Sequence, residues 1–370
     1  MRILILTDIN SAHSQKWIVA LSKKGVSIGI YTLSRSTSDW YKILSNVTLL
    51  YSANEQSTKF SAGILSKLSY LKALPALKKV ITAYRPDIVH AHYATSYGLL
   101  ARLSRFKPYM ISAWGSDVMS FPNKSFIHKG ILRKNLEGAA MVMATSETIS
   151  QAIKKVINCD VKIIPFGIDL TVFKKLEVKS VIAPGNVVVG TIKSMEEVYG
   201  IDVLIKAFAV LKNDKKIPSI KLLIVGTGTL ANTYKTLVRD LKIENDVVFT
   251  GKIGYENVVN YHNMIDIFVN VSRNESFGVS VIESSACEKP VIVSNVGGLP
   301  FVVRDKYTGL VVEVENYEET ANAIEQLIKN VELRISMGKA GRAFVASIFE
   351  LNKNTDELLR IYNQTLELKS

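Results

Sequence analysis

Apolar residues occur along this chain in short, nearly continuous runs that alternate with longer amphipathic stretches of helical length. The runs are rich in Val, Ile and Leu, which is typical of strands buried on both faces of a parallel sheet. The predicted strands cover residues 2–6, 26–31, 87–91, 109–113, 141–145 and 161–164 in the first half, and 187–192, 220–225, 247–251, 266–271, 290–294 and 309–314 in the second. Each half is therefore expected to form an open, doubly wound α/β domain.

The alternation is interrupted at residues 163–186, where two prolines and two glycines accompany a loss of periodicity. We therefore divide the chain into a first domain at 1–170, a second domain at 171–350 and a C-terminal helix at 351–370 that could pack back on the first. Open α/β sheets bind ligands beyond the carboxyl ends of their strands. Two such domains facing each other would enclose a cleft, lined by the loops that follow the strands.

The net charge of +13 is confined to the first half of the chain. Residues 1–170 contain 22 Lys and Arg against 9 Asp and Glu, whereas residues 171–370 contain 24 of each kind. Such segregation indicates that one domain faces an anionic surface or ligand. Because zinc-finger spacing and an RNP-like aromatic motif are missing, we expect an anionic membrane or a lipid phosphate rather than nucleic acid.

The segment 64–81 has the composition of a basic membrane helix. Its leucines recur at every third position and so drift around a helix, and Pro75 would interrupt that helix. Packing against the sheet is the favoured interpretation, and membrane contact is kept as an additional hypothesis. In either case four lysines add to the basic face: Lys67, Lys72, Lys78 and Lys79.

Cys159 and Cys287 are far apart in apolar surroundings, which indicates neither a disulfide framework nor a Cys/His metal cluster. The first residues lack the features of a signal peptide, and no run of about 18 apolar residues occurs. We expect a cytoplasmic protein, with peripheral association at the inner face of the cell membrane as a further expectation from the charge.

The stretch NESFGVSVIE places Glu275 and Glu283 eight positions apart around Gly278. The glutamates could form an acid/base pair, hold different parts of one ligand, or be ordinary surface charges. Gly278 allows close approach to a phosphate where a helix begins, and Glu283 would lie about one turn into that helix while Glu275 stays in the loop. A helical carboxylate can accept hydrogen bonds from two ribose hydroxyls. The second interpretation is therefore preferred.

An ordered set of motifs then resembles the family 4 glycosyltransferases. The motifs are NESFG with its E-x7-E pattern, PVIVSNVGGLP (290–300), IVGTGTL (224–230), IIPFGIDLTVF (163–173), and VGTIK (189–193) before YGIDVLIKAF (199–208). The resemblance implies the GT-B architecture, with two facing Rossmann-like domains. It also implies a nucleotide-sugar bound by the second domain, an acceptor bound by the first, and transfer with retention of anomeric configuration. No metal or other cofactor is expected, and no Asp-x-Asp occurs.

On the donor side, the resemblance places Lys193 as the basic ligand of the diphosphate. Glu275 would contact the donor sugar or a phosphate, and Glu283 the ribose. A second lysine is usual before the glycine that starts the next helix, but the stretch here is EEVYG, with Val198 and Tyr199. Arg273 is a candidate substitute. The remaining donor-side candidates are Phe277, Gly278, Val279 and Gly226. Two further departures, Glu288 and Phe301, are expected to alter packing or nucleotide fit.

On the acceptor side, the resemblance concerns segments that follow strands of the first half. His13 should face the cleft from TDINSAHSQKW (7–17), a loop that lacks the glycine-rich sequence of many relatives. In SAWGSDV (112–118), Trp114 stands where a histidine is common and could stack on a sugar. Asp117, beside Ser116, could accept the acceptor proton or cap a helix. His92 is chosen over His90 for the cleft, and His90 is expected to be buried and structural.

The leading hypothesis is a retaining, metal-independent glycosyltransferase that moves a sugar from a UDP- or GDP-linked donor to a glycan. The basic domain suggests a lipid-linked saccharide acceptor in surface polysaccharide assembly. An epimerase or phosphorolytic enzyme with the same plan is a second hypothesis. A nucleotide-sugar-binding partner subunit with weak catalysis is a third, because the lysine expected near Val198 is missing.

Overall fold

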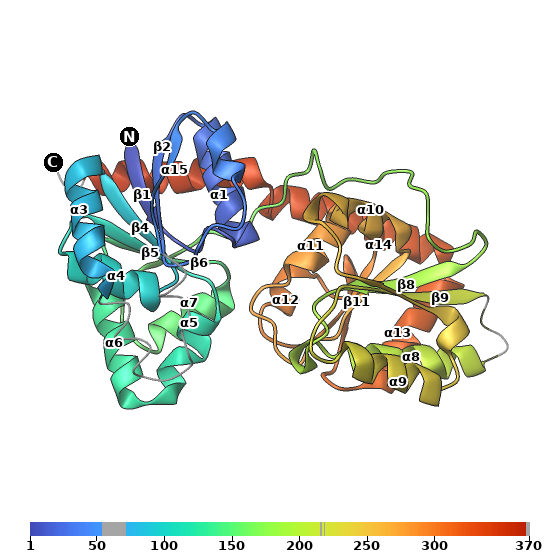
Figure 1. The fold of residues 1–370 in the computed structure, drawn as a ribbon. Coiled ribbons are helices and arrows are strands. Elements are labelled where there is room, and N and C mark those ends of the chain that lie inside the picture. Colours follow the sequence, from blue (N-terminus) through green and yellow to red (C-terminus); the bar gives the residue numbers. More distant parts are fainter. Residues whose placement is uncertain (54–71, 215–216, 218, 368–370) are drawn as a thin grey trace. The chain divides into compact units, whose positions relative to one another are not determined.

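The computed structural model describes residues 1–53, 72–214, 217 and 219–367. The chain divides into two compact units, each built on its own parallel sheet (Figure 1). Unit 1 comprises Met1–Phe166 together with Leu351–Ser370, and unit 2 comprises Gly167–Glu350. The C-terminal helix α15 (Leu351–Glu367) therefore belongs to the same unit as the first sheet.

The sheet of unit 1 has seven strands in the order β3-β2-β1-β4-β5-β6-β7, and all its neighbouring pairs are parallel. The strands are β1 (Arg2–Leu6), β2 (Ser27–Thr32), β3 (Val47–Ser52), β4 (Ile88–His92), β5 (Tyr109–Ala113), β6 (Met141–Ala144) and β7 (Val161–Ile163). The strand order reverses between β1 and β4. Loops that follow these two strands lie at the switch point where open α/β sheets bind ligands.

Helices cover both faces of this sheet, so its strands are buried on both sides. The helices are α1 (Ala12–Lys23), α3 (Leu74–Tyr84), α4 (Ser96–Ser104), α5 (Ser116–Met119), α6 (Phe126–Glu137), α7 (Glu147–Lys154) and the 3-10 turns η1 (Trp40–Ile43) and η3 (Phe121–Lys124). Leu4 and Leu6 of β1 pack in one apolar cluster, whereas Ile3 and Ile5 pack in the other. The second cluster includes Tyr362 of α15, so this helix completes the core of unit 1.

Unit 2 has a six-stranded parallel sheet in the order β10-β9-β8-β11-β12-β13. The strands are β8 (Val187–Ile192), β9 (Ile220–Val225), β10 (Val247–Gly251), β11 (Ile267–Asn270), β12 (Val291–Ser294) and β13 (Gly309–Val312). The helices are α8 (Ile201–Asn213), α9 (Ala231–Asp240), α10 (Val258–Met264), α11 (Val279–Ala286), α12 (Leu299–Val302), α13 (Tyr317–Lys329) and α14 (Val331–Ile348), with η4 (Glu197–Tyr199), η5 (Glu244–Asp246) and η6 (Tyr255–Asn257). The order reverses between β8 and β11, which places the switch point there.

The predicted fold class is confirmed, because the described strands form two doubly wound parallel sheets. Each predicted strand is present with ends within two residues of the prediction, but β3 was not predicted. This strand lies at the edge of its sheet and is fully buried only at Val47, so its sequence lacks a continuous apolar signal.

The prediction for residues 64–81 needs a correction. Pro75 lies in the first turn of α3 and so starts this helix rather than interrupting it. Leu77 is buried in the core, as expected for packing against the sheet, while Lys78 and Lys79 are exposed. Residues 64–71, including Lys67, lie outside the described residues. Within the described residues, none of the helices combines the length and apolar character needed to cross a bilayer.

Candidate active site

Lys193 and Glu275 meet at the switch point of the unit 2 sheet. Lys193 directly follows β8, and Glu275 lies in the loop between β11 and α11. The Lys193 ammonium forms a hydrogen-bonded ion pair with the Glu275 carboxylate, and the two side chains are only 13% and 12% exposed. Charges in such a water-poor place interact strongly with each other and with any ligand that enters.

The loop before α8 supplies an aromatic ring to the same lysine. Lys193 Nζ lies 4.5 Å from the centroid of the Tyr199 ring, within the range of a cation–π contact. The backbone carbonyl of Val198 accepts a hydrogen bond from the Arg273 amide, 2.8 Å away, so this loop is joined to the one that carries Glu275. Tyr199 therefore contacts Lys193 in the stretch where a second lysine was expected.

Two glycines allow the loops of this site to touch. Gly226 has a φ of 133°, and a Cβ there would lie 2.0 Å from the carbonyl oxygen of Lys193. Gly297 has a φ of 56°, and a Cβ there would lie 1.9 Å from the carbonyl oxygen of Glu275. Both contacts exclude any side chain. The GTG and NVGG motifs thus fix the backbones from which Lys193 and Glu275 extend.

Glu283 lies in α11 and points to different partners from Glu275. Its Oε1 is 3.5 Å from the Tyr255 hydroxyl, and its Oε2 is 3.6 Å from Nε2 of the fully buried His262. Glu275 instead pairs with Lys193. The two glutamates therefore have separate surroundings, which disfavours an acid/base pair around one bond and agrees with contacts to different parts of a ligand.

The residues between the two glutamates differ in how far they are buried. Gly278 is the N-cap of α11 with a φ of 97°, and Val279 is the first residue of that helix and half-buried. Phe277 is buried and packs against Phe301 and Phe349, with ring centroids 6.2 and 5.7 Å away. Phe277 was predicted as a donor-binding residue; its ring belongs to the core, so only its backbone is left to line a site.

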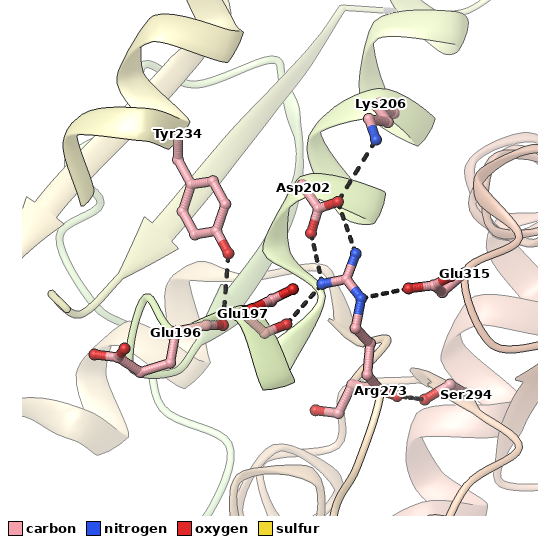
Figure 2. A network of polar contacts seen from close by, with 9 residues as sticks. Glu196, Glu197, Asp202, Lys206, Tyr234, Arg273, Ser294 and Glu315 are labelled. Atoms are coloured by element: carbon pink, nitrogen blue, oxygen red, sulfur yellow. Dashed lines mark hydrogen bonds and ion pairs between the residues drawn. The ribbon is translucent and has the colours of Figure 1, made fainter. Parts of the chain in front are cut away.

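Arg273 is engaged by other groups of the protein, as Figure 2 shows for Glu197, Asp202 and Glu315. Its NH1 and NH2 groups donate to the two carboxylate oxygens of Asp202, at 3.0 and 2.9 Å, and its Nε donates to Glu315 at 2.5 Å. The carbonyl of Glu197 accepts a further bond of 2.6 Å. Hydrogen bonding to Asp202 raises the pKa of Arg273 above its usual value. Arg273 thus ties α8 and the 196–200 loop to the loop carrying Glu275, and a donor contact by its guanidinium stays a prediction.

In unit 1, His13, Trp114 and His92 form one aromatic cluster with Phe166. His13 stacks on Phe166 at 4.1 Å between centroids, and Trp114 lies 4.6 Å from the His92 ring. His13 and Trp114 are half-buried, so each keeps some exposed surface. These side chains follow β1 and β5 or end β4, and they gather at the switch point of the sheet.

His92 was predicted to face a cleft, and its side chain is buried. Both His90 and His92 are buried, and His92 Nδ1 is hydrogen-bonded to the Thr7 hydroxyl at 3.0 Å. His90 bonds to the hydroxyls of Tyr362 and Ser112, at 2.6 and 2.8 Å. Burial, reinforced by His90, holds the pKa of His92 well below its usual 6.5, and burial lowers that of His90 to about 3. Both rings are therefore neutral at pH 7.

Asp117 also differs from its prediction. Its carboxylate is 1% exposed and accepts backbone hydrogen bonds from Ala94, Gly115 and Trp114 at 2.7, 2.8 and 3.2 Å. Burial raises the pKa of Asp117, and the backbone donors oppose this shift. Asp117 sits in the first turn of α5, whose N-cap is Gly115. It holds the β5–α5 turn against the loop after β4, and a role toward an acceptor hydroxyl stays a prediction.

Two families match consecutive parts of this chain. "Glycosyl transferase 4-like" matches residues 2–146, and "Glycosyl transferases group 1" matches residues 172–344, which include Lys193 and both glutamates. The chain belongs to the family 4 glycosyltransferases. It is therefore a glycosyltransferase with the GT-B fold.

Named relatives of this glycosyltransferase include N-acetyl-alpha-D-glucosaminyl L-malate synthase from Bacillus anthracis. That enzyme is 28% identical over 293 residues, which cover 76% of this chain and 75% of the relative. Among solved structures, sucrose-phosphate synthase from Thermosynechococcus elongatus superposes with a TM-score of 0.83 at 21% identity and covers 100% of both chains. HepE from Anabaena, in complex with UDP and glucose, superposes with a TM-score of 0.76 at 18% identity, covering 98% of this chain and 100% of that one. These two likenesses concern the fold.

Two site residues of the glycosyltransferase were missed from the sequence. His262 comes from α10 and reaches Glu283 only through the fold, so its sequence position carries no signal. Tyr93 directly follows β4 and has a φ of 87°, which is unusual for a bulky residue, and its hydroxyl is hydrogen-bonded to Ser116. Tyr93 follows His90 and His92 in HAHY, so its place after a strand could have been inferred. Among the described residues, no group of three or more potential metal ligands gathers.

Proposed function

We propose that this glycosyltransferase moves a sugar, with retention of anomeric configuration, from a UDP- or GDP-linked donor to a lipid-linked glycan. The reaction is proposed to need no metal and to serve surface polysaccharide assembly at the cytoplasmic face of the membrane. The observation that carries the proposal is the ion pair of Lys193 and Glu275 at the switch point of the unit 2 sheet. It places one cation and one carboxylate where ligands of such sheets bind.

The proposed role of Lys193 follows from the charge that develops on the leaving diphosphate. As the bond from the anomeric carbon to the diphosphate oxygen breaks, negative charge grows on that oxygen. A fixed ammonium in a water-poor site stabilises this charge more than water does. Glu275 and the Tyr199 ring hold the ammonium in place, so little reorganisation is needed when the bond breaks.

Retention is proposed to follow from attack on the face that the diphosphate leaves. The acceptor oxygen forms a bond to the anomeric carbon, the bond to the diphosphate breaks, and the departing diphosphate takes the hydroxyl proton. Glu283 binds the ribose and Glu275 the donor sugar or a phosphate, so neither acts as a nucleophile. The buried carboxylate of Asp117 and the neutral His92 are not assigned a proton-transfer role.

The lipid-linked acceptor is proposed from the charge of the two halves. Residues 1–170 have a net charge of +13, whereas residues 171–370 are neutral. A basic acceptor domain suits an acceptor that bears phosphate and lies in an anionic bilayer. Such a surface also concentrates the enzyme where its acceptor is found.

A thermal-shift screen of nucleotide-sugars tests the donor, because a bound ligand raises the apparent stability by mass action. The donor that binds is then incubated with lipid-linked saccharides, and NMR of the product reads the anomeric configuration. An inverted product contradicts retention, and donor epimerised without acceptor favours the epimerase hypothesis. If transfer activity is retained in both Lys193→Ala and Glu283→Ala, the proposed active site is contradicted.

A further inference from the structure

A hollow of about 750 Å³, a volume that includes open solvent at its mouth, lies in unit 1 at the ends of β4 and β5. It is bounded by α4, α5, η3 and α6. Its apolar lining comes from Leu99, Phe121 and Ile131, and hydroxyl groups surround these side chains. The hydroxyl-bearing residues are Tyr93, Thr95, Ser96, Ser116 and Ser120. The hollow thus offers both an apolar wall and polar groups at the carboxyl edge of the sheet, where ligands of this fold class bind.

The hollow is held in shape by its surroundings. Tyr93 keeps its φ of 87° because its amide bonds to the Ser112 carbonyl at 2.8 Å, and its own carbonyl accepts from Gly98 at 3.0 Å. A strained residue of this kind persists only where the structure enforces it, and such residues concentrate at functional sites. Asp117 also lines the hollow, and its carboxylate accepts the three backbone hydrogen bonds described above. Asn135 of α6 donates to the Ala94 carbonyl at 3.0 Å.

Beside the hollow, α6 begins with two exposed apolar side chains. Phe126 is 85% exposed and Ile127 is 54% exposed, at the first two positions of the helix. Their backbone is fixed, because Ser125 caps α6 by accepting from the His128 amide, and the His128 ring lies 4.8 Å from Phe121. Phe121 itself lines the hollow, so the exposed pair is linked to the hollow through His128 and Phe121.

The charge around this region indicates what covers it. Residues 121–137 contain four Lys and Arg against one Glu, and that Glu137 is paired with Arg133 at 2.7 Å. Lys124 is exposed and lines the hollow. A partner must therefore combine apolar groups with negative charge. An exposed Phe–Ile pair flanked by lysines is suited to the interface of an anionic bilayer.

We propose that this region binds a phosphate-bearing lipid at the membrane surface. Phe126 and Ile127 enter the bilayer interface, and the hollow holds the polar–apolar junction of one lipid, with its phosphate at Lys124. The inference rests on the proposed function and specifies its acceptor: a lipid-linked, phosphate-bearing saccharide would present its sugar from the hollow toward the end of the sheet where Trp114 and His13 gather.

Vesicle co-sedimentation of the full chain tests the membrane contact. Wild type should bind phosphatidylglycerol vesicles, more weakly as salt rises, and bind phosphatidylcholine vesicles poorly. The double variant Phe126→Ser/Ile127→Ser should lose about tenfold in affinity or more, and Lys124→Glu should also bind more weakly. Matched controls with the same changes elsewhere on unit 1, Ile43→Ser and Lys155→Glu, should bind like wild type. Equal binding of both vesicle types, or wild-type binding by the double variant, overturns the membrane contact.

The hollow is tested with dihexanoyl-phosphatidylglycerol below its micelle concentration. Wild type and the Phe126→Ser/Ile127→Ser variant should bind this monomeric lipid, whereas Ser120→Trp, which fills the hollow from an exposed position, should reduce affinity at least about tenfold. Unchanged binding by Ser120→Trp overturns the lipid site. Thermal shift with the nucleotide-sugar reports separately on unit 2, so a failed donor site with intact lipid binding contradicts the proposed function and not this inference.

Discussion

Lys193 Nζ lies 4.5 Å from the centroid of the Tyr199 ring while its ammonium is paired with the Glu275 carboxylate. The lysine is thus held between a ring face and an anion, at the end of the central β8. In the stretch where the resemblance led us to expect a second lysine, this chain presents an aromatic ring. The arrangement keeps Lys193 in place but adds no charge that could stabilise the leaving group.

Replacing Tyr199 by lysine tests whether the absence of a second cation lowers the rate of transfer. In Tyr199→Lys, a second ammonium would face the diphosphate, and kcat for transfer should rise about tenfold because leaving-group charge is better stabilised. Tyr199→Phe keeps the ring face and serves as the control, with kcat within about twofold of wild type. Steady-state release of the nucleoside diphosphate measures both. A Tyr199→Lys enzyme slower than Tyr199→Phe would show that the ring, rather than missing charge, is what the site requires.

His262 is expected to position Glu283 for the donor. In the part of the chain that the structure describes, neither ring nitrogen of His262 has a hydrogen-bond partner, and Nε2 lies 3.6 Å from Glu283. His262→Phe should weaken donor binding about threefold to tenfold, or about 0.7–1.4 kcal/mol, because the polar contact between its Nε2 and the Glu283 carboxylate is lost. His262→Gln retains an N–H donor and should restore most of the affinity.

Isothermal titration with the nucleotide-sugar measures this effect, with transfer rate at saturating donor as the second readout. A positioning role predicts a raised donor KM with kcat nearly unchanged. If His262→Phe binds the donor as tightly as wild type does, His262 has no role in positioning Glu283.

The buried histidines make stability depend on pH. Their pKa values are lowered in the folded state, to about 3 for His90 and well below 6.5 for His92, so the unfolded chain takes up their protons first as pH falls. Stability from these groups is present above pH 6.5 and is lost as pH falls from there toward 3. Each histidine contributes up to about 1.4 kcal/mol per pH unit in that window.

Urea unfolding at a series of pH values measures this slope. His90→Gln removes one titrating group and should reduce the slope between pH 6 and 4 by about 1 kcal/mol per unit, whatever its effect on stability at pH 7. An unchanged slope in His90→Gln would mean that other groups dominate the acid response.

Arg273 is expected to stabilise the folded protein through its ion pairs. Arg273→Lys keeps a positive charge but loses the paired bonds to Asp202, which a planar guanidinium makes and an ammonium cannot. The cost should be about 1–2 kcal/mol, which lowers the Tm by about 2–4 °C. Lys329→Gln, which removes an exposed ion pair of α13, is the control and should change stability by less than about 0.5 kcal/mol. A wild-type Tm for Arg273→Lys would contradict the network in Figure 2.

The fold could be predicted from the sequence because most of its strands are buried on both faces and are therefore almost entirely apolar. In β1, Ile3 and Leu4 enter opposite clusters, so the whole strand is apolar and its type can be predicted. The edge strand β3 was missed because it is not buried on both faces. Thr48 is exposed, and the next four residues are only half-buried. Motif spacing also placed Glu283 in a helix and Glu275 in the preceding loop, as the structure has them.

The directions and partners of side chains could not be predicted in this way. Phe277 is next to Gly278 in the motif, yet its ring packs on Phe349, which is 72 positions away in the sequence. His90 and His92 share one strand face, but Trp114 and Thr7, which cover His92, come from other strand ends. The Asp117 carboxylate accepts a hydrogen bond from the amide of Ala94, which is 23 residues away in the sequence. Each outcome depends on contacts between loops, which spacing along one segment does not reveal.

The central claim is that Lys193 stabilises the leaving diphosphate in sugar transfer. Its most direct test is the rate of nucleoside diphosphate release, at saturating donor and acceptor, in Lys193→Ala compared with Lys235→Ala, an exposed lysine of α9. We predict that Lys193→Ala loses at least about 100-fold in kcat while Lys235→Ala matches wild type. A Lys193→Ala enzyme with the wild-type rate would contradict the account.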